Sequence, residues 1–488
     1  MPAHHLIGPM LIGLMTLSLG CASAPKVQES PLNWALPSAW QSEHTAGAID
    51  SLWVSNLADS TLTALVQEAV SSNWDMKLAA ARMTAAMAQA RMAGAPLWPQ
   101  AQVAGSSSRR RQNFIGFPIP GGSSNGLTST TTNNGVNLNL SWEVDLWGRL
   151  RAGEAAALAD VLASRADLRA ARLSLAAQTA RAYFAVIESR GQLELARESL
   201  DNQLLALAQI RQRYERGLRP SLDLRLGRSA AAAAEAALHQ RDQLLDFSRR
   251  QLESLLGRYP GASLRAGAQL PQLSATVPVG LPSELIRRRP DLVAAERRLA
   301  AADSRLAQAQ RALYPRISLT ASGGRSSEQL GDLLKGDFSV WNLAANLTQP
   351  LFQGGRLRGG VELAESGVDG AVAAFAQSVL RALGEVEVGL AAEGYLALQE
   401  AALATAANEA LAARGLAEDR YQRGLSDLIT MLESQRRAFD AQSRLLAIRR
   451  QRLDNRLDLH LALGGGFQQS VSNAESLARE RHRSEVEQ

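Results

Sequence analysis

The sequence predicts a mixed α and β membrane protein in which one structural unit occurs twice along the chain. Three observations support this fold class: sequence markers that recur at a constant spacing, short segments in which apolar and polar residues alternate, and two helical stretches much longer than those of ordinary domains. Alternating segments pair as β-hairpins and long helices suit coiled coils. Each unit should therefore run helix, β-hairpin, very long helix, turn, helix.

Four markers in the first half of the chain return in the same order in the second half. The pairs are RYERGL and RYQRGL (213–218, 420–425), LLG and ALG (255–257, 462–464), LWP and LYP (97–99, 313–315), and the looser LWGR and LFQGGR (146–149, 351–356). Ordered markers of this kind predict a tandem duplication. The first copy holds about nine more residues between its Pro and Arg-Tyr markers, for which the stretch 105–135, rich in Gly, Ser, Thr and Asn, is the natural place.

The sequence features described in this section predict six segments. They are a signal peptide of lipoprotein type (1–20), a lipid-anchored linker (21–56), repeat one (57–257, with a hairpin at about 100–145 and a turn at about 213–223), an inter-repeat segment (258–283), repeat two (284–466, with a hairpin at about 316–348 and a turn at about 420–427), and a polar tail with a composition typical of disorder (467–488).

The single cysteine, Cys21, follows an apolar stretch at 6–19 that is too short to span a bilayer and ends in small residues. This pattern predicts an exported chain. It resembles a bacterial lipoprotein signal, which implies that Cys21 is acylated. A signal peptide that happens to end near a cysteine is the alternative, because no Lys or Arg precedes the stretch and Ser18 stands where such signals usually carry Leu.

Charge and histidine placement exclude several classes of function. The chain has 52 basic and 47 acidic residues with both signs interspersed, which is typical of solvated helix faces and not of a nucleic-acid-binding surface. The six histidines are scattered without metal-ligand spacing, and we find no phosphate loop and no nucleophile motif. We therefore expect no enzymatic activity, no cofactor, no bound metal and no nucleic-acid partner.

Strict alternation marks the second strand of each predicted hairpin, as in Leu138, Leu140 and Trp142 against Asn137, Asn139 and Ser141. A soluble sheet would show two such faces, but a membrane barrel also places aromatic residues near its strand ends. Six aromatic residues occupy such positions: Trp98, Trp142, Trp147, Tyr314, Trp341 and Phe352. We favour the membrane barrel. Four strands cannot close a barrel, because small transmembrane barrels need about eight or more, so several chains must share one.

The helices that follow the hairpins are unusually long. Residues 150–216 contain no proline, so about 65 residues can remain helical, or roughly 100 Å. Residues 356–423 also contain no proline and can form a helix of similar length. Leucines and aromatic residues recur every seven positions along parts of these stretches, which predicts left-handed coiled coils.

Taken together, these segments resemble the TolC-like outer-membrane efflux channels, in the NodT-type lipoprotein branch that works with resistance-nodulation-division pumps. The resemblance rests on WEVDLWGR (142–149), PSELIRRRPDL (282–292) and QPLFQGGR (349–356), and extends over about 53–464. It implies a homotrimer in which each chain gives four strands to a twelve-stranded outer-membrane barrel, above a periplasmic α-helical barrel.

The resemblance also implies a function and partners. The chain would be the passive exit duct of a tripartite efflux pump, lipid-anchored in the bacterial outer membrane, with a long periplasmic part. Its partners would be a periplasmic adaptor (membrane fusion) protein, an inner-membrane resistance-nodulation-division transporter and the outer-membrane lipid. A duct for type I protein secretion is the first alternative, and a periplasmic coiled-coil scaffold is the second.

Two groups of site residues follow from the same resemblance. The periplasmic gate would comprise Ile429, Glu433, Tyr421, Arg420 and Arg423, with Glu433 in place of the more usual Asp. Packing at the tip is an equally good interpretation of Tyr421. The adaptor-docking tips would comprise Gly217, Leu218, Gly424, Leu425 and Ser426.

Overall fold

The computed structural model describes residues 37–43, 47, 54, 59–114, 127–267, 269–273 and 278–465. The chain separates into the units Met1–Ala35 and Leu36–Gln488, and all described residues belong to the second. The expected signal peptide, Cys21, most of the expected 21–56 linker and the 467–488 tail lie outside the described residues.

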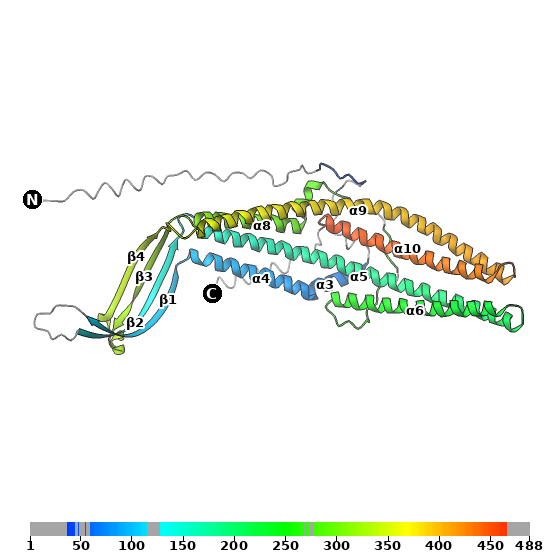
Figure 1. Cartoon of the computed structure of the whole chain (residues 1–488), viewed down its shortest axis with the longest axis horizontal. Helices are drawn as coiled ribbons and strands as arrows, with labels where there is room; N and C mark the ends of the chain where they lie inside the picture. Colours follow the sequence, from blue (N-terminus) through cyan, green and yellow to red (C-terminus); the bar gives the residue numbers. More distant parts are fainter. Residues whose placement is uncertain are drawn as a thin grey trace, which may run out of the picture. The chain divides into compact units, whose positions relative to one another are not determined.

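The elements of the second unit follow the same order in both halves of the chain (Figure 1). The first half contains α3 (Ser60–Ser72), α4 (Trp74–Gly94), β1 (Gln100–Phe114), β2 (Leu127–Val144), α5 (Arg149–Glu215) and α6 (Ser221–Leu255). The second half contains α7 (Leu285–Arg288), α8 (Pro290–Arg311), β3 (Arg316–Ser327), β4 (Ser339–Thr348), α9 (Arg356–Gln422) and α10 (Leu428–Ala462).

The four strands form one antiparallel sheet in the order β1-β2-β3-β4. Because each strand pairs only with its neighbour in the sequence, one edge of β1 and one edge of β4 have no partner among the described residues. The β1–β2 ladder continues past the end of the β2–β3 ladder, so the first hairpin extends beyond the rest of the sheet.

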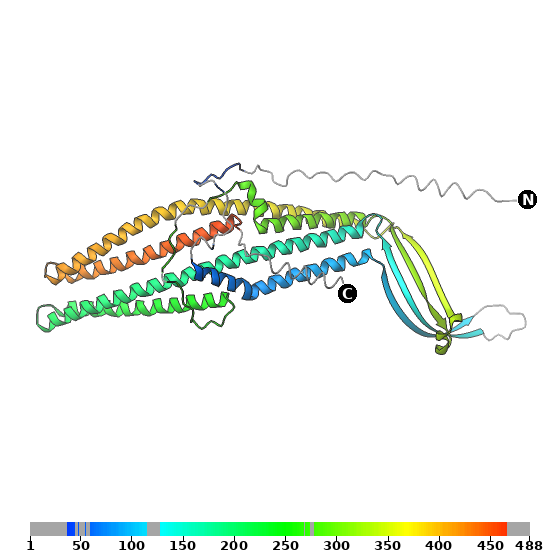
Figure 2. The same cartoon turned by 180° about the vertical axis from the view of Figure 1, so that it is seen from behind.

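The long helices α5 and α9 each contain 67 residues. At 1.5 Å per residue this is roughly 100 Å. The shorter α4 and α6 pack along α5, and α8 and α10 pack along α9. Figures 1 and 2 show the sheet at one end of these helices and the α5–α6 and α9–α10 turns at the other. No helix in the described part of the chain is both long enough and apolar enough to cross a membrane.

The short helices meet end to end, and equivalent residues make the joint in the two repeats. Asn73, which caps α4, donates from Nδ2 to the carbonyl oxygen of Leu255 at the end of α6, at 2.9 Å. Arg289, which precedes α8, donates from Nη1 to the carbonyl oxygen of Ala462 at the end of α10, at 3.1 Å. A helix end leaves carbonyl groups without partners, so each joint satisfies one of them.

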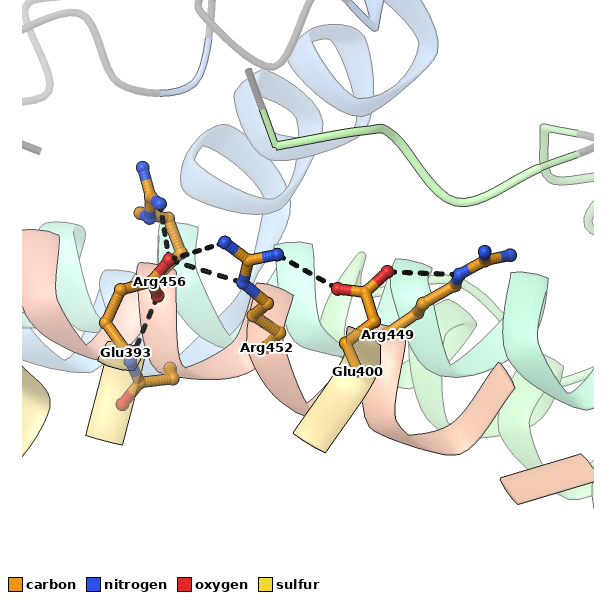
Figure 3. A network of polar contacts seen from close by, with 6 residues as sticks. Glu393, Glu400, Arg449, Arg452 and Arg456 are labelled. Atoms are coloured by element: carbon orange, nitrogen blue, oxygen red, sulfur yellow. Dashed lines mark hydrogen bonds and ion pairs between the residues drawn. The ribbon is translucent and has the colours of Figure 1, made fainter. Parts of the chain in front are cut away.

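A second set of contacts holds α10 against α9. Glu393 and Glu400 of α9 face Arg449, Arg452 and Arg456 of α10 in a continuous network (Figure 3). The Nη2 atom of Arg456 lies 2.7 Å from Oε1 of Glu393, and Nη1 of Arg452 lies 3.0 Å from Oε2 of Glu400. Shared carboxylates fix several long side chains at once, which makes such a network stiffer than isolated surface pairs.

The first part of the inter-repeat segment is tied to α6. The carboxylate of Glu253, which is 1% exposed, accepts backbone N–H bonds from Ala262, Ser263 and Leu264 at 2.7–2.9 Å. Burial alone would raise the pKa of Glu253, but these donors outweigh it and lower the pKa below its usual value. A buried, ionised carboxylate of α6 therefore anchors the start of the inter-repeat segment.

Candidate functional site

The sheet has one apolar face and one polar face. The ladders place Leu140 opposite Ala101 and Ala321, and Ala321 opposite Leu343, so apolar side chains form rows across all four strands. Leu140 is 39% exposed and Leu343 is 73% exposed. A large apolar face left open in one chain requires either lipid or protein to cover it.

The polar face is the concave one. A groove of about 510 Å³ lies against it. Its polar lining consists of Gln100, Gln102, Asn139, Ser141, Thr320, Ser322 and Asn342. None of these side chains is charged, so this wall provides hydrogen-bonding groups without favouring either sign of charge. The arrangement fits the inside of a water-filled barrel whose apolar side faces lipid.

Five of the six predicted girdle aromatics lie where the sheet joins the helices. These are Trp98, Trp142, Trp147, Tyr314 and Phe352. The rings of Trp147 and Tyr314 stack at 5.3 Å, and Nε1 of Trp147 donates to the carbonyl oxygen of Pro315 at 2.8 Å. Trp341 lies near the other end of β4 and is 82% exposed. The aromatic residues therefore border the apolar rows on both sides, with most of them on the helical side.

The two helical hairpins reverse direction in the same way. Gly217 and Gly424 have φ values of +68° and +76°, a region open to glycine. Leu218 N donates to Arg213 O at 2.9 Å and Leu425 N donates to Arg420 O at 2.8 Å, which closes each long helix with a Schellman-type turn. Leu218 and Leu425 are left 68% and 73% exposed at the tips.

Tyr421 lies in the core between the two hairpins. It is fully buried, in a cluster to which α5, α6, α9 and α10 all contribute. The guanidinium groups of Arg213 and Arg219 lie 5.1 and 5.3 Å from the centre of its ring. Within the described residues its hydroxyl has no hydrogen-bond partner. Within one chain, these contacts favour the packing interpretation of Tyr421.

The remaining expected gate residues lie around Tyr421 without forming one cluster with it. Arg423 pairs with Asp419 at 3.0 Å. Ile429 is 66% exposed, one helical turn before Glu433 on the same face of α10. Ser426 precedes Asp427, whose carboxylate caps α10 by accepting the N–H of Thr430 at 2.7 Å.

Glu433 has two basic partners on its own helix. Its Oε1 atom lies 2.8 Å from Nη2 of Arg436 and 2.8 Å from Nε of Arg437, and Arg436 also contacts Asp440 at 3.0 Å. Hydrogen bonds from Arg436 and then Arg437 lower the pKa of Glu433 to about 2. The four side chains carry no net charge together. Among the described residues, no group of three or more His, Cys, Asp or Glu could hold a metal ion.

The ion-pair and ring partners of Glu433 and Tyr421 were not predicted from the sequence. The constant offset between the repeats pairs Leu222 with Ile429 and Leu226 with Glu433, which would have shown that only the second repeat carries the acidic position. The sequence also contained the signal for the ion pairs of Glu433. Arg436 and Arg437 follow it by three and four residues, and side chains at these spacings meet on a helix. The contacts of Arg213 and Arg219 with Tyr421 depend on tertiary packing and left no local signal.

A further contact unforeseen from the sequence joins residues 37–43 to α9. Glu387 accepts the backbone N–H groups of Gln41 and Ser42 at 2.8 and 3.0 Å, and Oγ of Ser42 also donates to it, at 2.6 Å. Trp40 is 5% exposed and donates from Nε1 to the carbonyl oxygen of Gly280. We call the contact of Gln41 and Ser42 with Glu387 the clasp. It attaches residues 37–43 to the middle of α9.

Comparison with known proteins gives consistent relatives along nearly the whole chain. The family described as "Outer membrane efflux protein" matches residues 65–258 and 281–465. The chain is 35% identical to outer membrane protein OprJ of Pseudomonas aeruginosa, covering 94% of this chain and 96% of OprJ. It is 32% identical to the pyoverdine export outer membrane protein OpmQ of Pseudomonas putida, covering 94% and 98%.

Solved structures share the fold. A membrane protein from Pseudomonas aeruginosa superposes with a TM-score of 0.81 at 33% identity, covering 90% of this chain and 98% of that one. The outer-membrane channel OprN gives a TM-score of 0.79 at 26% identity, covering 90% and 99%.

These findings confirm the fold class expected from the sequence, in which each chain gives four strands to a trimeric barrel and long helices to a helical barrel. They also confirm that the chain is an efflux duct of the outer membrane and not an enzyme. The chain belongs to the outer membrane efflux protein family.

Proposed function

We propose that this duct conducts small solutes that an inner-membrane transporter of the resistance-nodulation-division class delivers through a periplasmic adaptor. The observation that carries the duct assignment is the two-faced sheet with free edges, set on helices of roughly 100 Å. Among the relatives, OpmQ is named for pyoverdine export and TtgF, 32% identical, for toluene efflux. These names favour small solutes over the secreted proteins of a type I system.

The tips are the proposed contact with the adaptor. Leu218 and Leu425 are apolar and exposed at the two turns, and Gly217 and Gly424 let the chain turn without a side chain in the way. Ser426 extends this surface in the second repeat. Exposed apolar residues on rigid turns suit recognition by another protein. Equivalent turns in both repeats would give a trimer pseudo-six-fold contacts.

Ile429 and Glu433 are the proposed constriction. Three-fold symmetry would place three copies of each side chain around one axis, an apolar ring beside an acidic ring. Each Glu433 is already paired with Arg436 and Arg437 of its own helix, so repulsion between the three carboxylates of the ring would be weak. Arg420 and Arg423 would lie at the outer border of this region.

We further propose that Cys21 carries the lipid anchor. The clasp fixes Gln41 to Glu387, which lies 31 residues along α9 from Arg356 and thus roughly 45 Å from the sheet. The 20 residues from Cys21 to Gln41 can extend to about 70 Å, enough to reach the membrane from the clasp. The six-segment division also remains a proposal, supported by the two separate stretches, 65–258 and 281–465, that match the family.

We expect the protein to migrate as a heat-modifiable trimer and to form channels in a planar bilayer, and we expect Glu433→Ala to raise their single-channel conductance. The variant removes a side chain from the proposed constriction, leaves Arg437 without its ion-pair partner and leaves Arg436 with Asp440 alone, so selectivity should also shift toward anions. Glu235→Ala is the matched control, since it removes an exposed carboxylate from α6 far from the tip. Unchanged conductance and selectivity in Glu433→Ala would overturn the gate assignment, and absence of any channel would favour a scaffold.

The charge of Glu433 should persist well below neutral pH. Its pKa of about 2 means that the carboxylate stays ionised as pH falls from 7 to 4. The difference in reversal potential between the natural protein and Glu433→Gln should therefore be constant over that range. In an Arg436→Gln/Arg437→Gln background, the pKa should return toward 4.5, and the same difference should shrink as pH falls through that value. A difference that already shrinks by pH 5 in the natural background would contradict the pairing.

Tyr421→Phe should leave conductance unchanged. The tyrosine hydroxyl has no partner among the described residues, so its removal breaks no contact, whereas Tyr421→Ala should open the tip by leaving a cavity among four helices. Tyr214→Phe provides the control, because Tyr214 is the equivalent residue of the first repeat and is 40% exposed. A large rise in conductance for Tyr421→Phe alone would show that its hydroxyl locks neighbouring chains.

Metabolic labelling with a fatty acid should mark the natural protein and not Cys21→Ser. Cys21 is the only cysteine, so no other thiol can take the label. Channel conductance of the purified Cys21→Ser trimer should be normal, since the anchor lies outside the conducting path. Equal labelling of both proteins, or none of either, would refute acylation at Cys21.

A further inference from the structure

Three consecutive arginines lie on β1 beyond the apolar rows of the sheet. Arg109, Arg110 and Arg111 pair with the threonines at 130–132 of β2, in the part of the hairpin that extends past β3 and β4. All three arginines are exposed. They lie at the end of the sheet opposite the helices, the end that faces away from the periplasm in the proposed orientation (Figure 1).

Strand alternation assigns these arginines to different faces. Arg109 and Arg111 share a face with Val103, which belongs to the apolar rows, while Arg110 shares the polar face with Gln102. Removal of Arg110 therefore takes away the same charge at the same height on the opposite face.

A fourth arginine joins the outward pair. On β3, Arg325 follows Gly323 by two residues and so lies on the same apolar face, one step beyond the row that contains Trp341. Its Nη1 atom donates to the carbonyl oxygen of Leu333 at 2.9 Å, which orients the guanidinium group. Through Val136 of β2, Arg325 aligns with Gly105 of β1, four residues before Arg109, so basic side chains begin at the last apolar row on β3 and continue further along β1.

The described surroundings offer these outward arginines little negative charge. The β2 residues opposite Arg109 and Arg111 are Thr132 and Thr130. The connection from β3 to β4 holds three acidic residues: Asp332 is paired with Lys335 at 2.8 Å, and Glu328 and Asp337 are exposed and form no ion pair with the arginines among the described residues. In the described part of the chain, neither Arg109 nor Arg111 forms an ion pair.

We propose that Arg109, Arg111 and Arg325 form a rim that binds the phosphate groups of lipid headgroups in the outer leaflet. Guanidinium groups bind phosphate through two parallel hydrogen bonds, and basic residues directly beyond an apolar span attract anionic headgroups. The proposal depends on the apolar face meeting lipid, which belongs to the proposed duct. Channel conductance tests the duct without testing the rim, so the two can fail separately.

The test is binding of lipid A, a doubly phosphorylated lipid, to the purified trimer in a neutral detergent, followed by native mass spectrometry. Arg109→Gln/Arg111→Gln should weaken lipid A binding about thirty-fold, given the usual contribution of each basic residue near a charged lipid surface. Arg110→Gln should bind as the natural protein does. Lipid A lacking its phosphates should bind the natural protein as weakly as lipid A binds the double variant.

Equal binding by the natural protein and the double variant would overturn the rim, and so would an equal loss in Arg110→Gln. Displacement of lipid A by inorganic phosphate at the same concentration would assign the site to free phosphate and not to lipid. If the double variant did not assemble, 0.5 M salt should weaken binding of lipid A to the natural trimer, because headgroup attraction is screened. Salt-independent binding would then reject the proposal.

Discussion

The unpaired backbone along the outer edges of β1 and β4 is the constraint on which the rest of the structure depends. In a membrane, each N–H or C=O group without a partner costs several kcal/mol, and no water is available to bind it. Four strands with two open edges therefore cannot exist alone in lipid. They can do so when β1 of one chain meets β4 of the next, and the concave polar face then becomes the wall of a shared lumen.

Closing a barrel from several chains requires that the helices beneath it also form a continuous wall. Two very long helices in each chain cannot do this alone, since the shorter ones must together match their length. The joints of Asn73 with Leu255 and Arg289 with Ala462 make each pair of short helices act as one long element. The equivalent position holds a neutral amide, Asn73, in the first repeat and a charged guanidinium, Arg289, in the second. Arg289 also pairs with Glu385 at 2.7 Å.

The features that the sequence predicted are those set by local chemistry. The alternation of residues predicted which face of each strand is apolar, and Gly217 and Gly424 predicted the two helical turns. The long proline-free stretches predicted α5 and α9. What it did not predict depends on residues far apart in the chain. Glu387 and Gln41 are 346 positions apart, and the burial of Tyr421 needs four helices to converge. Neither leaves a pattern in its own segment.

The two repeats differ at the tip, because only the second has an acidic residue at the proposed constriction. This difference restricts the mechanisms by which the constriction could open. Leu226 occupies the position equivalent to Glu433, so a trimer holds three carboxylates there and not six. Because Arg436 and Arg437 neutralise each carboxylate, charge repulsion cannot drive the proposed constriction open. The larger energy lies in the packing of Tyr421 against the first hairpin, through buried area and the guanidinium groups of Arg213 and Arg219. An adaptor that opened the proposed gate would therefore have to act on the separation of the two hairpins within each chain.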